Sequence, residues 1–296
     1  MSVTNVVIVG LGLIGGSVAL DLKRRGFAAH IVGVDSNEGH CAQALELGLV
    51  DEILPLERAL NNAELVILAI PVNAIAGILP GILDKIPEKC SITDMGSTKQ
   101  SICLAAASHP KRGQYVASHP MAGTENSGPG AALYDLFNGK VAVICDEAAS
   151  APLHLQRVES MYKVLGMRLL RMGSAEHDLH AAYVSHLSHI TSFVLANTVL
   201  AKEQNANTIF DLAGGGFEST VRLAKSSPEM WAPIFEQNRE NIIHALESYI
   251  EHFQKFHRTL VQQASDETRG LMADANRIRR VLTKMDDKTS KKGPAR

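Results

Sequence analysis

The segment VVIVGLGLIGGS, near the N-terminus, constrains the fold more than any other part of the chain. It places Gly10, Gly12 and Gly15 in the spacing GxGxxG, after an apolar run and before a helical pattern. In a strand–turn–helix unit the first glycine allows a tight turn, the second admits a pyrophosphate, and the third lets helix and strand pack closely. Leu13 and Ile14 begin the helix, whose free N–H groups attract an anion. The segment predicts a dinucleotide site.

Asp35 ends the second apolar run, twenty residues beyond Gly15. An acidic residue at this position accepts hydrogen bonds from the adenine ribose, and its charge repels a 2′-phosphate. The sequence therefore favours NAD. NADP stays possible because Ser36 and Asn37 could accommodate it if Asp35 turned away. A glycine turn without a ligand is the alternative interpretation.

Strand-like apolar runs alternate with helical stretches through the first half of the chain. Continuous apolar runs are typical of strands covered on both faces, and their alternation with helices predicts a parallel, doubly wound sheet of the Rossmann type. Helices are expected at 17–26, 38–47 and 151–166. The expected strands are 5–10, 30–35, 64–70, 90–96, 114–119, 140–146 and 167–172.

After Gly173 the pattern becomes helical, without strand-like runs. Residues 174–203 are expected to form one long helix with Ser174 as its N-cap. Two more helices are expected, at 228–263 and 266–285. We therefore predict three parts: a dinucleotide-binding domain (1–173), an all-helical domain for substrate binding and dimerisation (174–285), and a polar, disordered tail (286–296).

The charge balance of the chain argues against nucleic acid and anionic membranes as partners. Lys and Arg total 29 against 31 Asp and Glu, so the chain has no broad positive field for nucleic acid or an anionic membrane.

Four widely spaced cysteines fit a reducing cytoplasm. The N-terminal apolar run lacks a basic leader and is broken by glycines, so neither a signal peptide nor a membrane span is expected. The apolar helical half is expected to form a homodimer.

The stretch VASHPMAGTENSG places His119 before Pro120 at the end of an expected strand. Proline holds the preceding residue in extended geometry, so the imidazole stays at the edge of the sheet. Ser97 and Thr98, in DMGSTKQS, follow the neighbouring strand, and ligands of such sheets bind at these strand ends. A histidine beside a nicotinamide can accept a hydroxyl proton. The alternative is a histidine that only caps the sheet edge.

Five motifs in order over roughly residues 1–250 resemble the prephenate dehydrogenase family. They are GLGLIGGS, DMGSTK, SHPMAGTENSG, HDLHAAYVSHLSH and GGGFESTVRLAKSSPEMW. The resemblance implies an NAD(P)-dependent oxidative decarboxylation of prephenate to 4-hydroxyphenylpyruvate, a step of tyrosine biosynthesis. Arogenate is the other substrate of the family, and the sequence leaves the choice between the two open.

The resemblance also implies roles for residues. His119 is implied to bind and polarise the C4 hydroxyl, Ser97 to hydrogen-bond the same hydroxyl, and Arg222 to clamp a carboxylate. Further positions are implied to line the substrate pocket or to close its mouth: Ser185, His189, Gly215 and Trp231 for the pocket, Thr124 and Glu125 for the mouth. One departure from the family pattern is Ser188, where a proline is frequent.

Each of these roles competes with a simpler one. Arg222 could pair with Glu218 on its own helix, and Ser185 and His189 could belong to a packing face. The long helix also carries four histidines, at 177, 180, 186 and 189. Because nine residues of regular helix place His177 and His186 on opposite faces, no metal site is expected.

Two rival functions remain for a chain of this layout. A β-hydroxy acid dehydrogenase uses a lysine base on the long helix, but residues 174–201 contain no lysine. A non-catalytic dinucleotide sensor would not need His119, Ser97 and Arg222 together.

Overall fold

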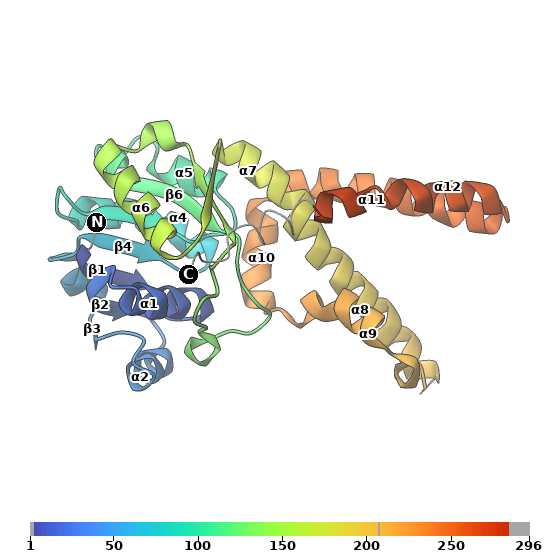
Figure 1. The fold of residues 1–296 in the computed structure, drawn as a ribbon, viewed down its shortest axis with the longest axis horizontal. Coiled ribbons are helices and arrows are strands. Elements are labelled where there is room, and N and C mark those ends of the chain that lie inside the picture. The colour runs from blue at the N-terminus through green and yellow to red at the C-terminus, as the bar shows by residue number, and fades with distance from the viewer. Residues whose placement is uncertain (1–2, 207, 284–296) are drawn as a thin grey trace, which may run out of the picture. The chain divides into compact units, whose positions relative to one another are not determined.

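The computed structural model describes residues 3–206 and 208–283. The chain divides into two compact units, residues 1–239 and 240–296, and each is treated by itself. The first unit contains the sheet and the helices that follow it as far as α10 (Figure 1). The predicted tail, 286–296, lies outside the described residues.

Eight strands form one sheet in the order β3-β2-β1-β4-β5-β6-β7-β8. Neighbouring strands are parallel except β6 and β7, which are antiparallel, so the prediction of a wholly parallel sheet is wrong at that pair. The sequence also did not predict β3, which has two residues. The strands are Val3–Val9, Ala28–Val34, Glu52–Ile53, Leu65–Leu68, Ser91–Asp94, Tyr115–Pro120, Val141–Cys145 and Arg168–Met172.

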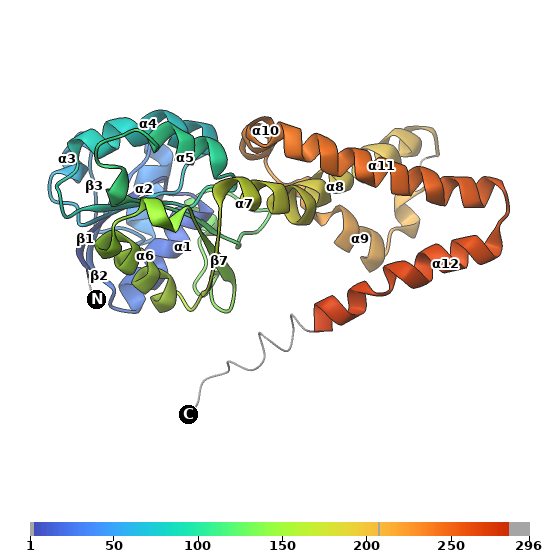
Figure 2. The ribbon, with the colours of Figure 1, turned by 90° about the horizontal axis from the view of Figure 1, so that it is seen from above.

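Helices cover both faces of this sheet, which explains why its strands are continuous apolar runs. Side chains of α3, α4 and α5 pack on one face and side chains of α1, α2 and α6 on the other (Figure 2). These helices span Leu13–Arg24 (α1), Glu38–Glu46 (α2), Leu56–Leu60 (α3), Val72–Lys85 (α4), Gln100–Ala106 (α5) and Pro152–Val164 (α6). The prediction of a doubly wound, Rossmann-type sheet is confirmed.

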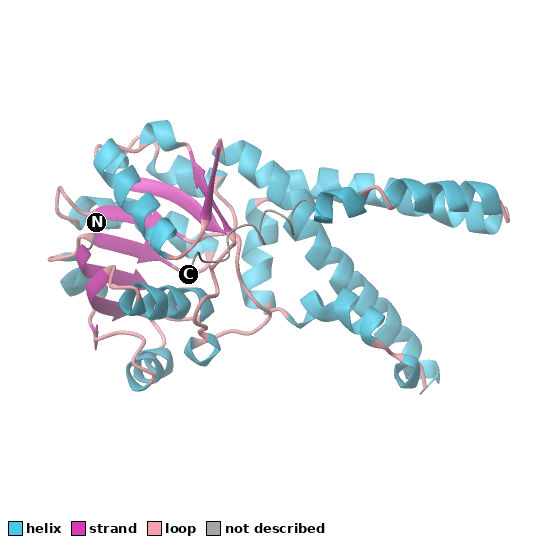
Figure 3. Cartoon of the chain, in the orientation of Figure 1, coloured by secondary structure: helices cyan, strands magenta, loops and turns pink. Residues whose placement is uncertain are grey.

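The described residues after β8 contain helices and no strand (Figure 3). The predicted long helix is present, as α7 (Ser174–Ala181), a π-helical turn (Ala182–His186) and α8 (Leu187–Ala206). Ser174 is not its N-cap: Gly173 is, and the Asp146 carboxylate accepts the Ser174 N–H at 2.9 Å.

Shorter helical segments complete the first unit, and two helices make up most of the described part of the second. The single helix predicted for residues 228–263 is wrong, because the segment forms two helices that are separated at Asn238. The helices are α9 (Gly215–Val221), α10 (Pro228–Gln237), α11 (Arg239–Val261) and α12 (Ser265–Ala275), with a 3₁₀ turn at Arg222–Lys225. No helix among the described residues has the length and apolar character to cross a membrane.

The connection between β6 and β7, residues 121–140, is attached to α1. The Leu133 N–H donates to Ser17 Oγ at 2.9 Å, and the Asp135 N–H donates to the buried Asp21 carboxylate. The Asp135 carboxylate in turn accepts from Arg24 and Arg25. The connection therefore runs from the strand that carries His119 to the helix of the glycine turn.

Two helical glycines give opposite predictions for substitution by alanine. A Cβ on Gly15 would lie 1.9 Å from the Gly10 carbonyl oxygen, whereas a Cβ on Gly77 would have no atom within 4 Å. Gly15→Ala is expected to destabilise the fold by more than about 2 kcal/mol, and Gly77→Ala to stabilise it by about 0.5–1 kcal/mol. Urea unfolding of the two variants measures both values. Equal stabilities would show that the turn is not packed as described.

Candidate active site

The glycine turn has the geometry that a pyrophosphate requires. Gly10 has a φ of +96°, which favours glycine, and a side chain there would meet the Ala69 carbonyl. Gly12 is different: a Cβ on it would meet nothing within 4 Å, so space lies in front of its backbone. Gly12 is also the N-cap of α1, and no side chain caps the helix. The free N–H groups of Leu13, Ile14 and their neighbours fit an anion.

Asp35 is held at this turn and does not turn away from it. Its carboxylate accepts the Leu11 N–H at 2.8 Å and the Asn37 N–H at 2.9 Å, and its side chain is 12% exposed. Each carboxylate oxygen retains a further lone pair for a ribose hydroxyl. The residues present therefore fit a dinucleotide, and the Asp35 carboxylate could accept from the hydroxyls of its adenine ribose.

His119 begins a chain of buried hydrogen bonds. Its Nδ1 lies 2.8 Å from Nε2 of His177, and Nδ1 of His177 lies 2.8 Å from Oδ1 of Asp178. All three side chains are nearly inaccessible, with exposed fractions of 7%, 3% and 2%. The Asp178 carboxylate also accepts the backbone N–H groups of Lys99 and Gln100, at 2.7 and 2.9 Å. This arrangement fixes both imidazoles in orientation.

The same arrangement fixes where the protons lie. An ionised carboxylate only accepts, so His177 donates its Nδ1–H to Asp178 and presents an unprotonated Nε2 to His119. His119 must then donate its own Nδ1–H to His177. The Nε2 atom of His119 is consequently left with a free lone pair, which makes it a hydrogen-bond acceptor and a potential base.

Burial keeps the His119 imidazole neutral at rest. Burial lowers the pKa of His119 well below its usual value, and the positive charge of Lys99 acts in the same direction. Lys99 is itself fully buried and pairs with Asp94, which also accepts the Tyr115 hydroxyl at 2.6 Å. A neutral imidazole with a free Nε2 is ready to take up a proton.

A second group of predicted residues lies together on the helical segments. The rings of His189 and Trp231 stack with centroids 3.5 Å apart, and His189 donates its Nδ1–H to the Ser185 carbonyl at 3.0 Å. Burial lowers the pKa of His189, and the charge of Arg222 lowers it further. Arg222 is half exposed and donates to the Glu125 carboxylate at 3.0 Å. Arg222 thus pairs with the loop after β6 and not with Glu218.

The remaining predicted residues are less closely tied to these groups. Ser97 is half-buried in the turn after β5, next to the strand that carries His119. Thr124 accepts the Asn126 N–H at 3.2 Å and so shapes the loop that carries Glu125. Gly215 begins α9 and is exposed.

The π-helical turn corrects the argument that placed His177 and His186 on opposite faces. A π turn advances by fewer degrees per residue than an α-helix, so it rotates the residues that follow it. Both imidazoles are buried, and the Asn238 amide donates both to Nδ1 of His186 and to the backbone carbonyl of Asp178, the neighbour of His177. Among the described residues, no group of three or more histidine, cysteine or acidic side chains could hold a metal ion.

Sequence reasoning missed three residues of the site. His177 and Asp178 stand in the motif HDLHAAYVSHLSH, but the sequence predicts no role in the site for either of them. Lys99 stands in DMGSTK beside Ser97. One signal could have identified His177 and Asp178: an imidazole and a carboxylate stand next to each other at the start of the helix that follows the last strand.

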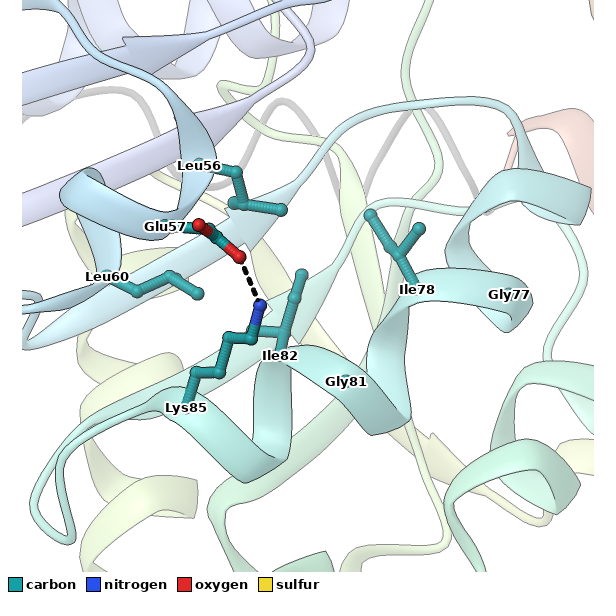
Figure 4. A pocket seen from close by; sticks show the side chains of 8 residues that line it. All are labelled: Leu56, Glu57, Leu60, Gly77, Ile78, Gly81, Ile82 and Lys85. Carbon is teal, nitrogen blue, oxygen red and sulfur yellow. Dashed lines mark hydrogen bonds and ion pairs between the residues drawn. The ribbon is translucent and has the colours of Figure 1, made fainter.

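A hollow of about 220 Å³ between α3 and α4 contains none of the predicted site residues. Its floor is apolar, and the Glu57–Lys85 ion pair, at 2.6 Å, crosses it (Figure 4). It lies outside the groups described above.

The buried histidines predict a loss of stability at mildly acid pH. Burial lowers the pKa of His186 to about 4, whereas an unfolded histidine titrates near 6.5. The unfolded chain therefore takes up protons first, and stability is lost as the pH falls from about 6.5 to 4, on the order of 3 kcal/mol for this residue. Urea unfolding at pH 7.5 and 5.0 measures the loss, which His186→Gln should reduce. An equal loss in the variant would contradict this assignment.

Two family models cover most of the chain. The nucleotide-binding domain of prephenate dehydrogenase matches residues 18–171, and the dimerization domain of prephenate dehydrogenase matches residues 173–274. Prephenate dehydrogenase of Bacillus subtilis is 31% identical over 88% of this chain and 71% of its own length. Cyclohexadienyl dehydrogenase of Zymomonas mobilis is 28% identical over 88% of this chain and 90% of its own.

Solved structures agree with these matches. Prephenate dehydrogenase of Aquifex aeolicus, in complex with hydroxyphenyl propionate and NAD+, aligns with a TM-score of 0.87 at 30% identity, covering 95% of this chain and 99% of that one. Arogenate dehydrogenase of Synechocystis aligns with a TM-score of 0.76 at 27% identity, covering 94% and 100%. This chain belongs to the prephenate dehydrogenase family.

Proposed function

We propose that this enzyme catalyses the NAD-dependent oxidative decarboxylation of prephenate to 4-hydroxyphenylpyruvate, in tyrosine biosynthesis. The observation that carries the proposal is the hydrogen-bonded chain His119–His177–Asp178, which leaves Nε2 of a buried, neutral His119 free. That atom can accept the proton of the C4 hydroxyl when the carbon is oxidised.

His119 takes the hydroxyl proton on Nε2 and becomes an imidazolium. His177 accepts the Nδ1–H of this imidazolium, and Asp178 stabilises the positive charge through His177. Bound NAD supplies the acceptor for the hydride. Loss of carbon dioxide from C1 leaves its bonding electrons in the ring, which becomes aromatic, and His119 can return its proton to the phenolate oxygen. Burial of all three residues excludes water from the proton path.

Arg222 is proposed to bind a carboxylate of the substrate in place of Glu125. Its guanidinium can hold a carboxylate with two hydrogen bonds. The ion pair of Arg222 with Glu125 is exposed and screened by solvent, so a substrate carboxylate can readily take the place of Glu125. We assign the remaining pocket to residues around this pair and His119. They are Ser97, Thr124, Ser185, His189, Gly215 and Trp231.

We further propose that residues 1–173 bind the cofactor and 174–285 serve substrate binding and dimerisation. The carboxylate of Asp35 at the glycine turn favours NAD over NADP. Homodimerisation through the helical part would cover apolar side chains that the described residues expose. These include Val194 and Leu200 of α8 and Tyr249, Ile250, Phe253 and Leu260 of α11. A reducing cytoplasm suits the four free cysteines.

Arogenate is a second candidate substrate, because Glu125 lies beside Arg222. Arogenate carries an amino group where prephenate carries a keto oxygen. Once a substrate carboxylate displaces Glu125 from Arg222, the freed Glu125 carboxylate can pair with the ammonium group. The same two side chains would then recognise an amino acid end.

The proposed function is tested by absorbance at 340 nm on mixing enzyme, NAD and prephenate. The absorbance should rise, and it should stay flat for a β-hydroxy acid dehydrogenase or a dinucleotide sensor. His119→Asn should lower kcat by about 10²–10⁴ while NADH binding is retained. His177→Leu, which removes the acceptor for the His119 Nδ1–H, should lower kcat by at least about tenfold.

His177→Gln is the matched control for the leucine variant. Its amide oxygen can still accept from His119, so kcat should recover at least partly. The pH profile of kcat should also move in the leucine variant, because the imidazolium loses its partner. If leucine and glutamine variants have equal kcat values and unchanged profiles, His177 does not act on the proton of His119.

The Arg222–Glu125 pair predicts opposite effects of two neutral substitutions. Arg222→Gln should raise KM for prephenate at least about tenfold, because a charge-assisted hydrogen bond is lost. Glu125→Gln should leave or lower KM for prephenate and raise KM for arogenate, because only the latter has an ammonium group. Steady-state kinetics with both substrates measure these ratios. Equal changes for the two substrates in Glu125→Gln would exclude the ammonium contact.

A further inference from the structure

The carboxylate at the adenine ribose has an imidazole beside it. Nδ1 of His40 lies 3.7 Å from Oδ2 of Asp35, and the His40 side chain is 39% exposed. His40 belongs to the first turn of α2, whose N-cap Asn37 accepts the His40 N–H at 3.1 Å. Asn37 also donates its own N–H to Asp35. The backbone of this turn therefore fixes His40 next to Asp35.

The connection between β6 and β7 borders the other side of His40. A Cβ on Gly128 would lie 4.0 Å from Nε2 of His40, and a Cβ on Gly130 would lie 3.1 Å from the Gln43 amide. This connection is held by α1 through Ser17 and Asp21. The imidazole is thus confined between the turn after β2 and a fixed segment.

Few ionisable groups surround His40. Asp35 faces it, and Glu38 and Cys41 lie on its own helix. The 3₁₀ turn that packs on α2, Pro129–Ala131, carries none. His30 of β2 and Glu52 of β3 pair with each other at 3.0 Å. Among the described residues, His40 is the basic group that lies within ion-pair distance of Asp35.

We propose that His40 determines cofactor specificity, by setting the charge that meets the 2′ position of the adenine ribose. The inference rests on the proposed function, in which Asp35 binds that ribose. Neutral His40 leaves the Asp35 carboxylate to accept the two hydroxyls of NAD and to repel a phosphate. Protonated His40 offsets the Asp35 charge and offers an N–H donor to a 2′-phosphate. The enzyme then binds NADP as well, with increasing affinity as the pH falls.

The test is a binding titration, read from the fluorescence of the reduced nicotinamide, of NADH and NADPH at pH 6.0 and 8.5. In the unaltered enzyme the ratio of the NADPH Kd to the NADH Kd should fall by about five- to tenfold at the lower pH. A 2′-phosphate also titrates near pH 6, which lowers this ratio without any protein group. His40→Gln measures that contribution, and its ratio should fall clearly less.

His40→Arg carries a positive charge at both pH values, so its ratio should be low at both. NADH should bind all three proteins with similar Kd values, since Asp35 and the glycine turn are unchanged. If His40→Gln shows the same pH dependence as the unaltered enzyme, or His40→Arg does not improve NADPH binding, the proposal is wrong. Failure of the unaltered enzyme to bind NADH would instead overturn the proposed function.

Discussion

The hydrogen bond between Asp178 and His177 is the interaction on which the rest of the site depends. It orders the protons along three buried side chains and so decides which nitrogen of His119 carries no proton. A buried histidine without such a partner could hold its proton on either nitrogen. Without Asp178, the atom proposed as the base would be occupied in part of the molecules.

The Asp178 carboxylate also links the sheet of the first unit to the helices that follow it. Asp178 accepts N–H groups from the start of α5, at Lys99 and Gln100, so it attaches α7 to the end of the sheet. Its backbone carbonyl accepts from the Asn238 amide, which also donates to Nδ1 of His186. Asp178 therefore contributes both to the orientation of the His177 and His119 imidazoles and to the attachment of α7. Any movement of α7 relative to β5 would disturb His119.

Local patterns in the sequence predicted seven of the eight strands, the helices α1, α2 and α6, the long helix after β8 and the glycine turn, but neither β3 nor the helices α3, α4 and α5. Gly10, Gly12 and Gly15 act within a single turn, and strands buried on both faces are continuous apolar runs. The antiparallel pairing of β7 and the break at Asn238 could not be predicted, because both depend on partners distant in the sequence. The Asp146 carboxylate that takes the place of a Ser174 cap is another such partner.

The same difference between local signals and contacts of distant residues applies to the candidate site. His119 was found because a strand end and a following proline are local signals. The contact of His119 with His177, and that of Arg222 with Glu125, join residues 58 and 97 positions apart. The π-helical turn also altered the phase of the long helix, and regular periodicity could not predict it. The spacing of residues in the sequence identifies candidate chemical groups, but the tertiary fold determines which of these groups are in contact.

The most direct test of this account is the protonation of His119 in solution. NMR of the enzyme labelled with ¹⁵N-histidine, at pH 7.5, distinguishes a protonated ring nitrogen from an unprotonated one. The account predicts a proton on Nδ1 of His119 and a lone pair on Nε2. A proton on Nε2 of His119 in the intact enzyme would contradict it.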